Sequence, residues 1–126
     1  MKKEIYSNQV PKPIGPYSQA IKSNNLIFIS GQIAIDIKKG KLVAENITEE
    51  TTIIMETIKH LLTESNCTFK NVVKSSIFLS NINQFDDVNK VYKHYFEEPY
   101  PARETMEVSR LPKNVNVEIS MIAISK

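Results

Sequence analysis

The chain is poor in the residues on which most metal and cofactor sites depend. Its 126 residues include three glycines, two histidines, one cysteine and no tryptophan. The single cysteine, Cys67, excludes an internal disulfide and favours the cytoplasm as the compartment. The two histidines lack metal-ligand spacing, and three scattered glycines provide no loop that cradles phosphate. The sequence therefore predicts a protein without a bound metal and without a nucleotide cofactor.

Charge of one sign and long apolar runs are also scarce. Sixteen basic residues stand against 14 acidic ones, a formal net charge of +2, which is too balanced to indicate nucleic acid or an anionic membrane as a partner. No apolar run approaches the roughly 18 residues of a membrane span, and none of signal-peptide length follows the first lysines. At this length we expect one domain, residues 1–126, with its own core.

What is present is a pattern of strands around two helices. Apolar periodicity predicts helices over 47–65 and 83–97, capped by Asn46 or Thr48 and by Asn83. Strands are predicted over 17–23, 26–30, 72–80, 103–111 and 115–124, after an extended segment 1–16 and with short alternation over 33–37. Gly31, directly after a strand, predicts a bulge. This order predicts an α+β fold, in which two helices pack on one face of a mixed β-sheet.

The other face of the sheet is predicted to be semi-polar. Its candidate residues are Ser75, Thr105, Glu107 and Ser109, and strand alternation places Glu118 opposite the apolar face of its own strand. A single layer of helices leaves this second face uncovered. Another copy of the chain is the obvious cover.

Both arginines, Arg103 and Arg110, fall within residues 100–111, although the other 14 basic residues are lysines. A planar guanidinium binds a carboxylate through two parallel hydrogen bonds, which lysine cannot do. Arg103 opens a predicted strand after a proline-marked turn, where a guanidinium can be held still. From residue types alone, Arg103 either binds a carboxylate ligand or forms an ordinary ion pair.

Further candidates for a cofactor-free site are Tyr17, Ser30, Asn89, Thr105 and Glu118. Each also has a structural interpretation, as a core tyrosine, a turn serine or an acid on a solvated strand. Asn89 falls within the apolar stripe of the second helix, so its amide must bond either to backbone in the core or to a site. Thr105 shares strand parity with Arg103 and is expected to face the same cleft.

Several segments together resemble the Rid family, also called the YjgF family, of reactive-intermediate deaminases. They are residues 14–20 (IGPYSQA), 30–33 (SGQI), 101–103 (PAR), 107–113 (EVSRLPK) and 117–119 (VEI). The resemblance covers essentially the full chain in order and spacing. Within the family the chain looks most like the RidA type, which keeps the arginine.

The resemblance implies a chorismate-mutase-like domain that assembles as a homotrimer, with a site in each cleft between subunits. It implies a cofactor-independent 2-iminobutanoate/2-iminopropanoate deaminase. Such an enzyme hydrolyses imines, formed from enamines that pyridoxal-phosphate enzymes release, to 2-keto acids and ammonia. Arg103 would bind the substrate carboxylate, and Glu118 would position or deprotonate the attacking water.

The remaining candidates would bind substrate in this resemblance. Tyr17 would close the pocket, Ser30 and the Gly31 backbone would line one wall, and Asn89 matches a family asparagine near the site. Thr105 would hold the imine nitrogen or the water.

Two positions depart from the family pattern. Thr105 stands where many relatives carry a cysteine, which rules out a thiol mechanism at that position. Glu104 stands where relatives often have a small residue. Strand parity directs its side chain away from Arg103, whereas contact between the two would weaken carboxylate binding.

Two other functions compete with the deaminase. Relatives have been described as endoribonucleases or translation inhibitors, but the scattered lysines offer no stacking platform for RNA. A protein that binds small carboxylates in its clefts without catalysis is the third hypothesis. Tight binding of 2-ketobutyrate without turnover would favour it.

Overall fold

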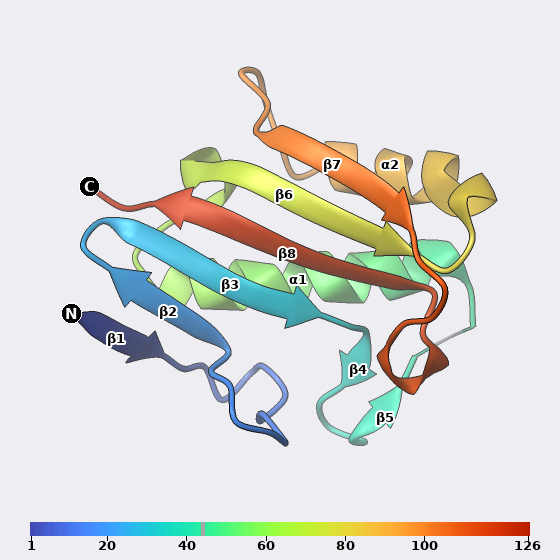
Figure 1. Cartoon of the computed structure of the whole chain (residues 1–126), viewed down its shortest axis with the longest axis horizontal. Helices are drawn as coiled ribbons and strands as arrows, with labels where there is room; N and C mark the ends of the chain where they lie inside the picture. The colour runs from blue at the N-terminus through green and yellow to red at the C-terminus, as the bar shows by residue number, and fades with distance from the viewer. Residues whose placement is uncertain (44) are drawn as a thin grey trace.

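The computed structural model describes residues 1–43 and 45–126, which form eight strands and two α-helices (Figure 1). The strands are β1 (Lys2–Ile5), β2 (Ala20–Ser23), β3 (Leu26–Gln32), β4 (Ile35–Asp36), β5 (Lys41–Leu42), β6 (Val72–Leu79), β7 (Ala102–Glu107) and β8 (Val117–Ile124). The helices are α1 (Ile47–Glu64) and α2 (Phe85–Lys93). Three short 3₁₀ turns are η1 (Phe69–Asn71), η2 (Ile82–Gln84) and η3 (Pro112–Asn114).

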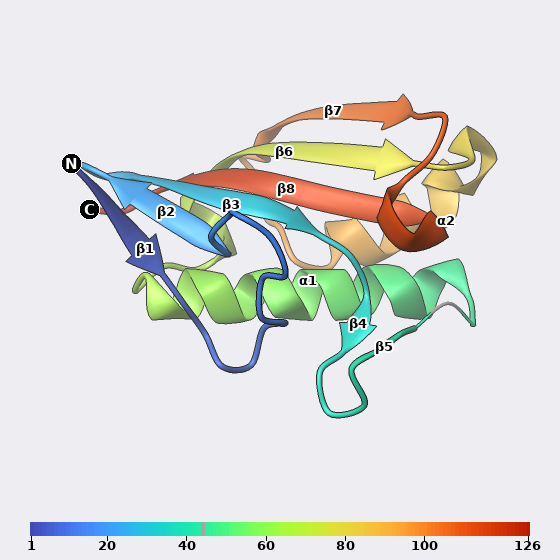
Figure 2. The ribbon, with the colours of Figure 1, turned by 60° about the horizontal axis from the view of Figure 1, so that its bottom comes forward.

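Six strands form one twisted sheet in the order β1-β2-β3-β8-β6-β7. Strands β6 and β7 run parallel, and the other neighbours are antiparallel. Strands β4 and β5 form a separate hairpin beyond the end of β3. Figure 2 shows the helices on one side of the sheet, with α1 running along its length. The predicted α+β fold, a mixed sheet with two helices on one face, is confirmed.

Helix α1 follows its prediction closely. The Asn46 side chain accepts a hydrogen bond from the Glu49 N–H at 2.8 Å, which satisfies a free donor of the first turn. The stripe that packs against the sheet is fully buried and consists of Ile54, Ile58, Leu61 and Leu62. Within the described residues, no helix is both long and apolar enough to cross a membrane.

Helix α2 begins later and ends earlier than predicted. Residues Ile82–Gln84 form a 3₁₀ turn in which the Asn81 side chain, not that of Asn83, provides the cap. Tyr95 and Phe96 lie beyond the helix, yet both pack against the core. An apolar stripe reflects burial and not the backbone hydrogen-bond pattern, so it cannot separate a 3₁₀ turn or a C-terminal extension from the helix itself.

The strand predicted over 17–23 is confined to β2, because the preceding loop is fixed by a buried side chain. The Gln19 amide donates to the carbonyls of Ser7 and Val10 and accepts from the Ser7 N–H. Tyr17 therefore lies in this loop and not in a strand. The N-terminal segment, predicted only as extended, supplies strand β1, which pairs with β2.

A bulge shifts the register at the start of β6. The pairing with β8 shifts by one residue between Val72 and Lys74, and Val73 is exposed. Ser75 is fully buried on the helix side of the sheet, so the prediction that placed it on the open face was wrong.

The polar side chains of strand β7 lie on the opposite face of the sheet from the predicted one. Thr105 pairs with Ile77, and Glu107 pairs with Leu79. Ile77 and Leu79 are fully buried beneath the helices. Paired residues share a face, so Thr105 and Glu107 point to the helix side. Ser109, placed with them from the sequence, lies beyond the end of β7.

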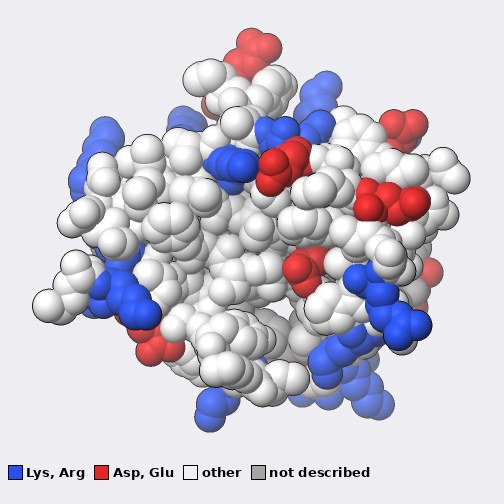
Figure 3. All heavy atoms as spheres, in the orientation of Figure 1, with Lys and Arg blue, Asp and Glu red and all other residues white. Residues whose placement is uncertain are grey.

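The open face of the sheet carries exposed apolar side chains among polar ones. Figure 3 shows this face, with most charged side chains around its rim. Its exposed apolar residues include Leu26, Phe28, Met106 and Ile124. Ser76 and Ser120 lie between them on the central strands. This face is therefore a candidate contact surface for another protein.

Candidate active site

Arg103 lies at the start of the edge strand β7 and points to the helix side. Its guanidinium carbon is 5.2 Å from the centre of the Phe85 ring and 5.0 Å from that of Tyr92. Its Nη1 donates a hydrogen bond to Oδ1 of Asn89 at 2.6 Å. Two aromatic faces and one amide therefore hold the cation in place.

The three residues that hold Arg103 lie on one face of α2. Phe85, Asn89 and Tyr92 are spaced at i, i+4 and i+7, the spacing of a helical stripe. The Tyr92 hydroxyl donates to Ser75 Oγ at 2.9 Å, which fixes the ring, and burial raises the pKa of Tyr92. Of the two outcomes that the sequence left open for Asn89, the structure shows contact with a candidate site residue.

A cavity of about 480 Å³ opens beside Arg103. Asn89, Tyr92, Lys93, Tyr100 and Pro101 line it together with the guanidinium. A guanidinium carries five N–H donors, and within the described residues one hydrogen-bond acceptor, Asn89, meets them. The arrangement suits a carboxylate that takes two donors at once.

Glu104 points away from Arg103, as strand parity predicted. Its carboxylate accepts a hydrogen bond from Ser76 Oγ at 2.8 Å and lies 3.5 Å from Lys74 Nζ, both on the open face. The hydroxyl of Ser76 and the ammonium of Lys74 lower the pKa of Glu104. The carboxylate is thus paired on its own side of the sheet and does not compete for Arg103.

Glu118 projects from β8 on the open face, over the bulge in β3. The bulge falls between Ile29 and Gln32, as predicted from Gly31. A Cβ atom built on Gly31 would lie 2.5 Å from Glu118 Oε2, so any other residue would displace the carboxylate from this position. Partial burial raises the pKa of Glu118.

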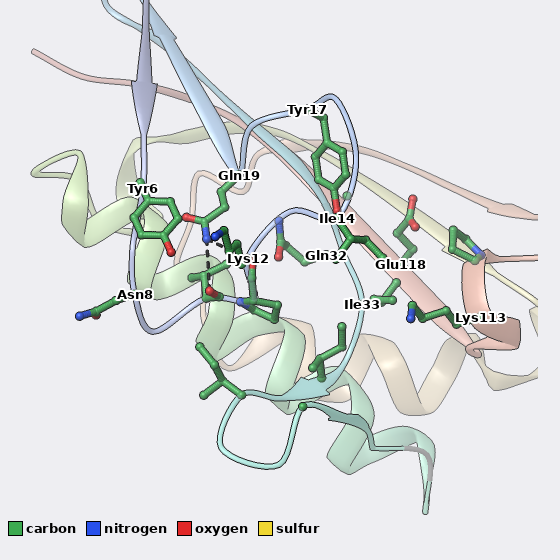
Figure 4. A pocket seen from close by; sticks show the side chains of 17 residues that line it. Tyr6, Asn8, Lys12, Ile14, Tyr17, Gln19, Gln32, Ile33, Lys113 and Glu118 are labelled. Atoms are coloured by element: carbon green, nitrogen blue, oxygen red, sulfur yellow. Dashed lines mark hydrogen bonds between the residues drawn. The ribbon is translucent and has the colours of Figure 1, made fainter.

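A second cavity, of about 760 Å³, lies beside Glu118. Figure 4 shows Tyr17, Ile14 and Lys113 around the carboxylate. Lys113 and the residue after it adopt positive φ angles of 56°, a conformation that costs free energy in residues other than glycine. No sequence pattern indicated Lys113 as a neighbour of Glu118, because only the geometry of this turn brings it there.

Ser30 and Thr105 do not line the cavity beside Arg103 or the cavity beside Glu118. Ser30 Oγ donates to the carbonyl of Ser18 at 2.6 Å, so its hydroxyl braces the loop that carries Tyr17. Thr105 faces the helix side, as does Arg103, and its predicted parity is confirmed. It lines a separate hollow with Phe85 and not the cavity of Arg103, so the expectation that it faces the same cleft as Arg103 was wrong.

The candidate residues therefore form two separate groups in one chain. The Arg103 group contains Arg103, Asn89 and Thr105 on the helix side of the edge strand. The Glu118 group contains Glu118, Tyr17 and Gly31 on the open face. Arg103 and Glu118 lie two strands apart and three positions apart in register, which is roughly 14 Å within the plane of the sheet. No small ligand can touch both groups of the same chain.

Metal chemistry has no candidate cluster in the part of the chain that the structure describes. Groups of three or more His, Cys, Asp or Glu side chains that could hold an ion are not found there. The candidate chemistry consists of a guanidinium, a carboxylate with a raised pKa and neighbouring polar groups.

Replacing Gly31 by alanine is expected to push the Glu118 carboxylate toward solvent and lower its pKa toward the ordinary value. The added Cβ overlaps the carboxylate, and the burial that raises the pKa is lost. Carbon-detected NMR titration of the glutamate carboxyls measures this shift. Gly15→Ala is the matched control, because its Cβ would meet Tyr17 at an ordinary 3.5 Å. An unchanged Glu118 midpoint in Gly31→Ala would contradict this account.

Known proteins resemble this chain over nearly its whole length. A family described as Endoribonuclease L-PSP matches residues 7–125. A RutC family protein of Pyrococcus horikoshii is 47% identical over 123 residues, which cover 98% of each protein. The human protein named 2-iminobutanoate/2-iminopropanoate deaminase is 40% identical over 124 residues, covering 98% of this chain and 90% of that protein. A Yersinia pestis structure, titled as a Rid family protein of unknown function, matches with TM-score 0.95 at 42% identity, covering 98% and 99% of the two chains.

Proposed function

The chain belongs to the Rid family, whose members include proteins described as Endoribonuclease L-PSP, and from that premise we propose that it hydrolyses 2-imino acids to 2-keto acids and ammonia. The observation that carries the proposal is the held guanidinium of Arg103, which faces a cavity fit for a small carboxylate. The human relative's name, 2-iminobutanoate/2-iminopropanoate deaminase, supports the same chemistry. The two small imines in that name are the first substrates to test.

The site is shared between two copies of the chain in this proposal. Arg103 and Glu118 are too far apart in one chain to meet one substrate, and each opens toward solvent. The apolar open face of the sheet provides a surface against which further copies can pack. A homotrimer brings Arg103 of the partner subunit to Glu118, and three such sites form around the assembly.

The chemistry needs one bound water and one acid–base group. Arg103 of the partner subunit holds the carboxylate of the imino acid, with Asn89 fixing the guanidinium. Glu118 takes a proton from water as the water oxygen bonds to the imine carbon and the C=N electron pair moves to nitrogen. That proton passes to the nitrogen and gives a carbinolamine. Glu118 then moves a second proton from the carbinolamine hydroxyl to the nitrogen, the C–N bond breaks as the C=O bond forms, and the 2-keto acid and ammonia leave. A carboxylate with a raised pKa suits this role near neutral pH.

Tyr17 and Gly31 border the bound substrate in the proposed site, and Ser30 supports it indirectly. Tyr17 closes the cavity over Glu118, and the Gly31 backbone forms the adjoining wall. Ser30 keeps the Tyr17 loop in place through Ser18. Thr105 shares a strand face with Arg103 but lines a separate hollow, so it supports the strand that carries Arg103 and does not contact the substrate.

Mixing two inactive variants tests the shared site. Arg103→Ala and Glu118→Gln are each expected to lose activity, since each removes one half of every site. Dissociated and reassembled at equal amounts, they should regain about a quarter of wild-type turnover, because half of the guanidinium positions and half of the carboxylate positions remain intact at random. Turnover is followed as 2-ketobutyrate release from 2-iminobutanoate formed by a threonine dehydratase. A mixture as inactive as its components would contradict a shared site.

A further inference from the structure

The cavity beside Arg103 contains a second cation that the proposed reaction does not use. Lys93 lines this cavity of about 480 Å³ together with Arg103, and no acidic side chain is among the described residues of its wall. A ligand with one carboxylate, bound to the guanidinium, leaves the ammonium of Lys93 without an anionic partner. The cavity therefore has one positive charge more than such a ligand needs.

The position of Lys93 relative to the guanidinium follows from helix α2. Lys93 comes four residues after Asn89, so the two side chains leave the same face of the helix with their Cβ atoms about 5–6 Å apart. Asn89 Oδ1 accepts the hydrogen bond from Arg103 Nη1 at 2.6 Å. The Lys93 ammonium, on its flexible four-carbon stem, can therefore reach a ligand group that lies about one helical turn from the guanidinium.

The protein's own acids neutralise neither cation. Over residues 1–43 and 45–126, neither Lys93 nor Arg103 forms an ion pair with an acidic side chain. Glu97 comes four residues after Lys93, but it lies beyond the end of α2, so the helical spacing that would pair the two is not kept. A cavity lined by charge of one sign concentrates ligands of the opposite sign.

A stabilising role at the end of the helix does not explain why Lys93 lies beside Arg103. Lys90 and Lys93 both lie in the last turn of α2, where a cation interacts favourably with the helix dipole. Lys90, however, lines a different hollow, together with Asp87 and His94. The dipole therefore favours lysine at both positions, and only Lys93 adds charge to the cavity of Arg103.

We propose that Lys93 binds a second carboxylate and that the site accepts dicarboxylic 2-imino acids, such as those formed from aspartate and glutamate. The inference rests on the proposed function, because it names a substrate class of the same site. Arg103 binds the carboxylate beside the imine carbon, and Lys93 binds the carboxylate at the end of the side chain. A short carbon chain separates the two carboxylates, so one ligand meets both cations of one chain. An exposed ion pair of this kind is worth up to about fivefold in affinity.

The imines of glutamate and norvaline test the inference, because norvaline has a methyl group in place of the side-chain carboxylate. D-Aspartate oxidase forms the first imine and D-amino-acid oxidase the second, with catalase present, and keto-acid release is measured above the spontaneous rate. The glutamate imine is expected to have about fivefold the kcat/KM of the norvaline imine. A preference for the norvaline imine would overturn the inference and leave the proposed function standing.

A matched pair of variants assigns the preference to Lys93. Lys93→Met removes the charge and keeps the length of the side chain, and the glutamate-to-norvaline ratio of kcat/KM should fall about fivefold. Lys90→Met removes the same charge from the same turn and should leave the ratio within about twofold. Equal ratios in the two variants, both shown to be folded, would overturn the role of Lys93.

Binding of the keto-acid products separates this inference from the proposed catalysis. In isothermal titration calorimetry, the wild type should bind 2-oxoglutarate about fivefold more tightly than 2-oxopentanoate, and Lys93→Met should lose this difference. If no imine is hydrolysed faster than spontaneously but this binding pattern is found, the proposed function fails and the dicarboxylate site stands. If the wild type binds the two products equally, the dicarboxylate site is wrong, whatever the turnover.

Discussion

Arg103→Ala is expected to reduce kcat/KM for 2-iminobutanoate by about 10²–10⁴-fold, because the carboxylate loses two charge-assisted hydrogen bonds of about 1.5–3 kcal/mol each. The side chain is exposed on an edge strand, so the free energy of unfolding should change by no more than about 1 kcal/mol, the value of the lost contacts with Phe85 and Tyr92. The dehydratase-coupled release of 2-ketobutyrate measures the first quantity and urea denaturation the second.

Two controls make this result specific to the guanidinium. Arg103→Lys keeps the charge but not the planar fork, and its activity should fall between those of the wild type and the alanine variant. Arg110→Ala removes the chain's other arginine, which is exposed, and should leave turnover unchanged. Full activity in a folded Arg103→Ala would exclude the carboxylate clamp. RNA cleavage that survives in this variant, without imine turnover, would instead support the endoribonuclease hypothesis.

The long periodic elements of the fold could be predicted from the sequence. Helix α1 and strand β8 each repeat their apolar pattern over many residues, and each begins within two residues of its predicted start. Near α2 the pattern was present too, but the 3₁₀ turn at Ile82–Gln84 changed where the helix starts. The ends of an element were therefore predicted accurately where its apolar pattern was long.

Strand parity identified which residues lie together but not which face they take. Arg103 and Thr105 do share a face, as predicted, and Glu104 takes the other. Polar residues on β7 were assigned to the open face because helix-facing positions are usually apolar. An edge strand escapes this rule, since α2 covers it only in part and Arg103 remains exposed beside the helix.

Residue types in the sequence pointed to the candidate residues of the site. They did not predict that these residues divide into the Arg103 group and the Glu118 group. Sequence spacing brings no information about the thickness of the sheet that separates Arg103 from Glu118. The cavity beside Glu118 was equally hidden, because Ile33, Ile35 and Ile37 form an alternating run that is typical of an ordinary strand. Only the hairpin of β4 and β5 turns this run into a cavity wall.

Glu50 is a buried acidic residue in the first turn of α1. Its side chain is fully buried, and its carboxylate accepts three hydrogen bonds at the start of β8. The donors are the Asn116 N–H at 2.8 Å, Asn116 Nδ2 at 2.8 Å and the Val117 N–H at 3.2 Å. Glu50 thereby ties α1 to the residues directly before Glu118.

Glu50→Ala is expected to lower the free energy of unfolding by about 3–5 kcal/mol, because it leaves one buried and two partly buried donors without their acceptor at about 1–3 kcal/mol each, less what entering water restores. Urea denaturation at one fixed protein concentration measures the loss, since assembly makes stability depend on concentration. Glu50→Gln keeps one acceptor oxygen and should lose less. Glu49→Ala, an exposed neighbour in the same turn, should change stability by no more than about 0.5 kcal/mol. Equal stability of the Glu49 and Glu50 alanine variants would show that water replaces the carboxylate at no cost, and that β8 holds Glu118 in position without it.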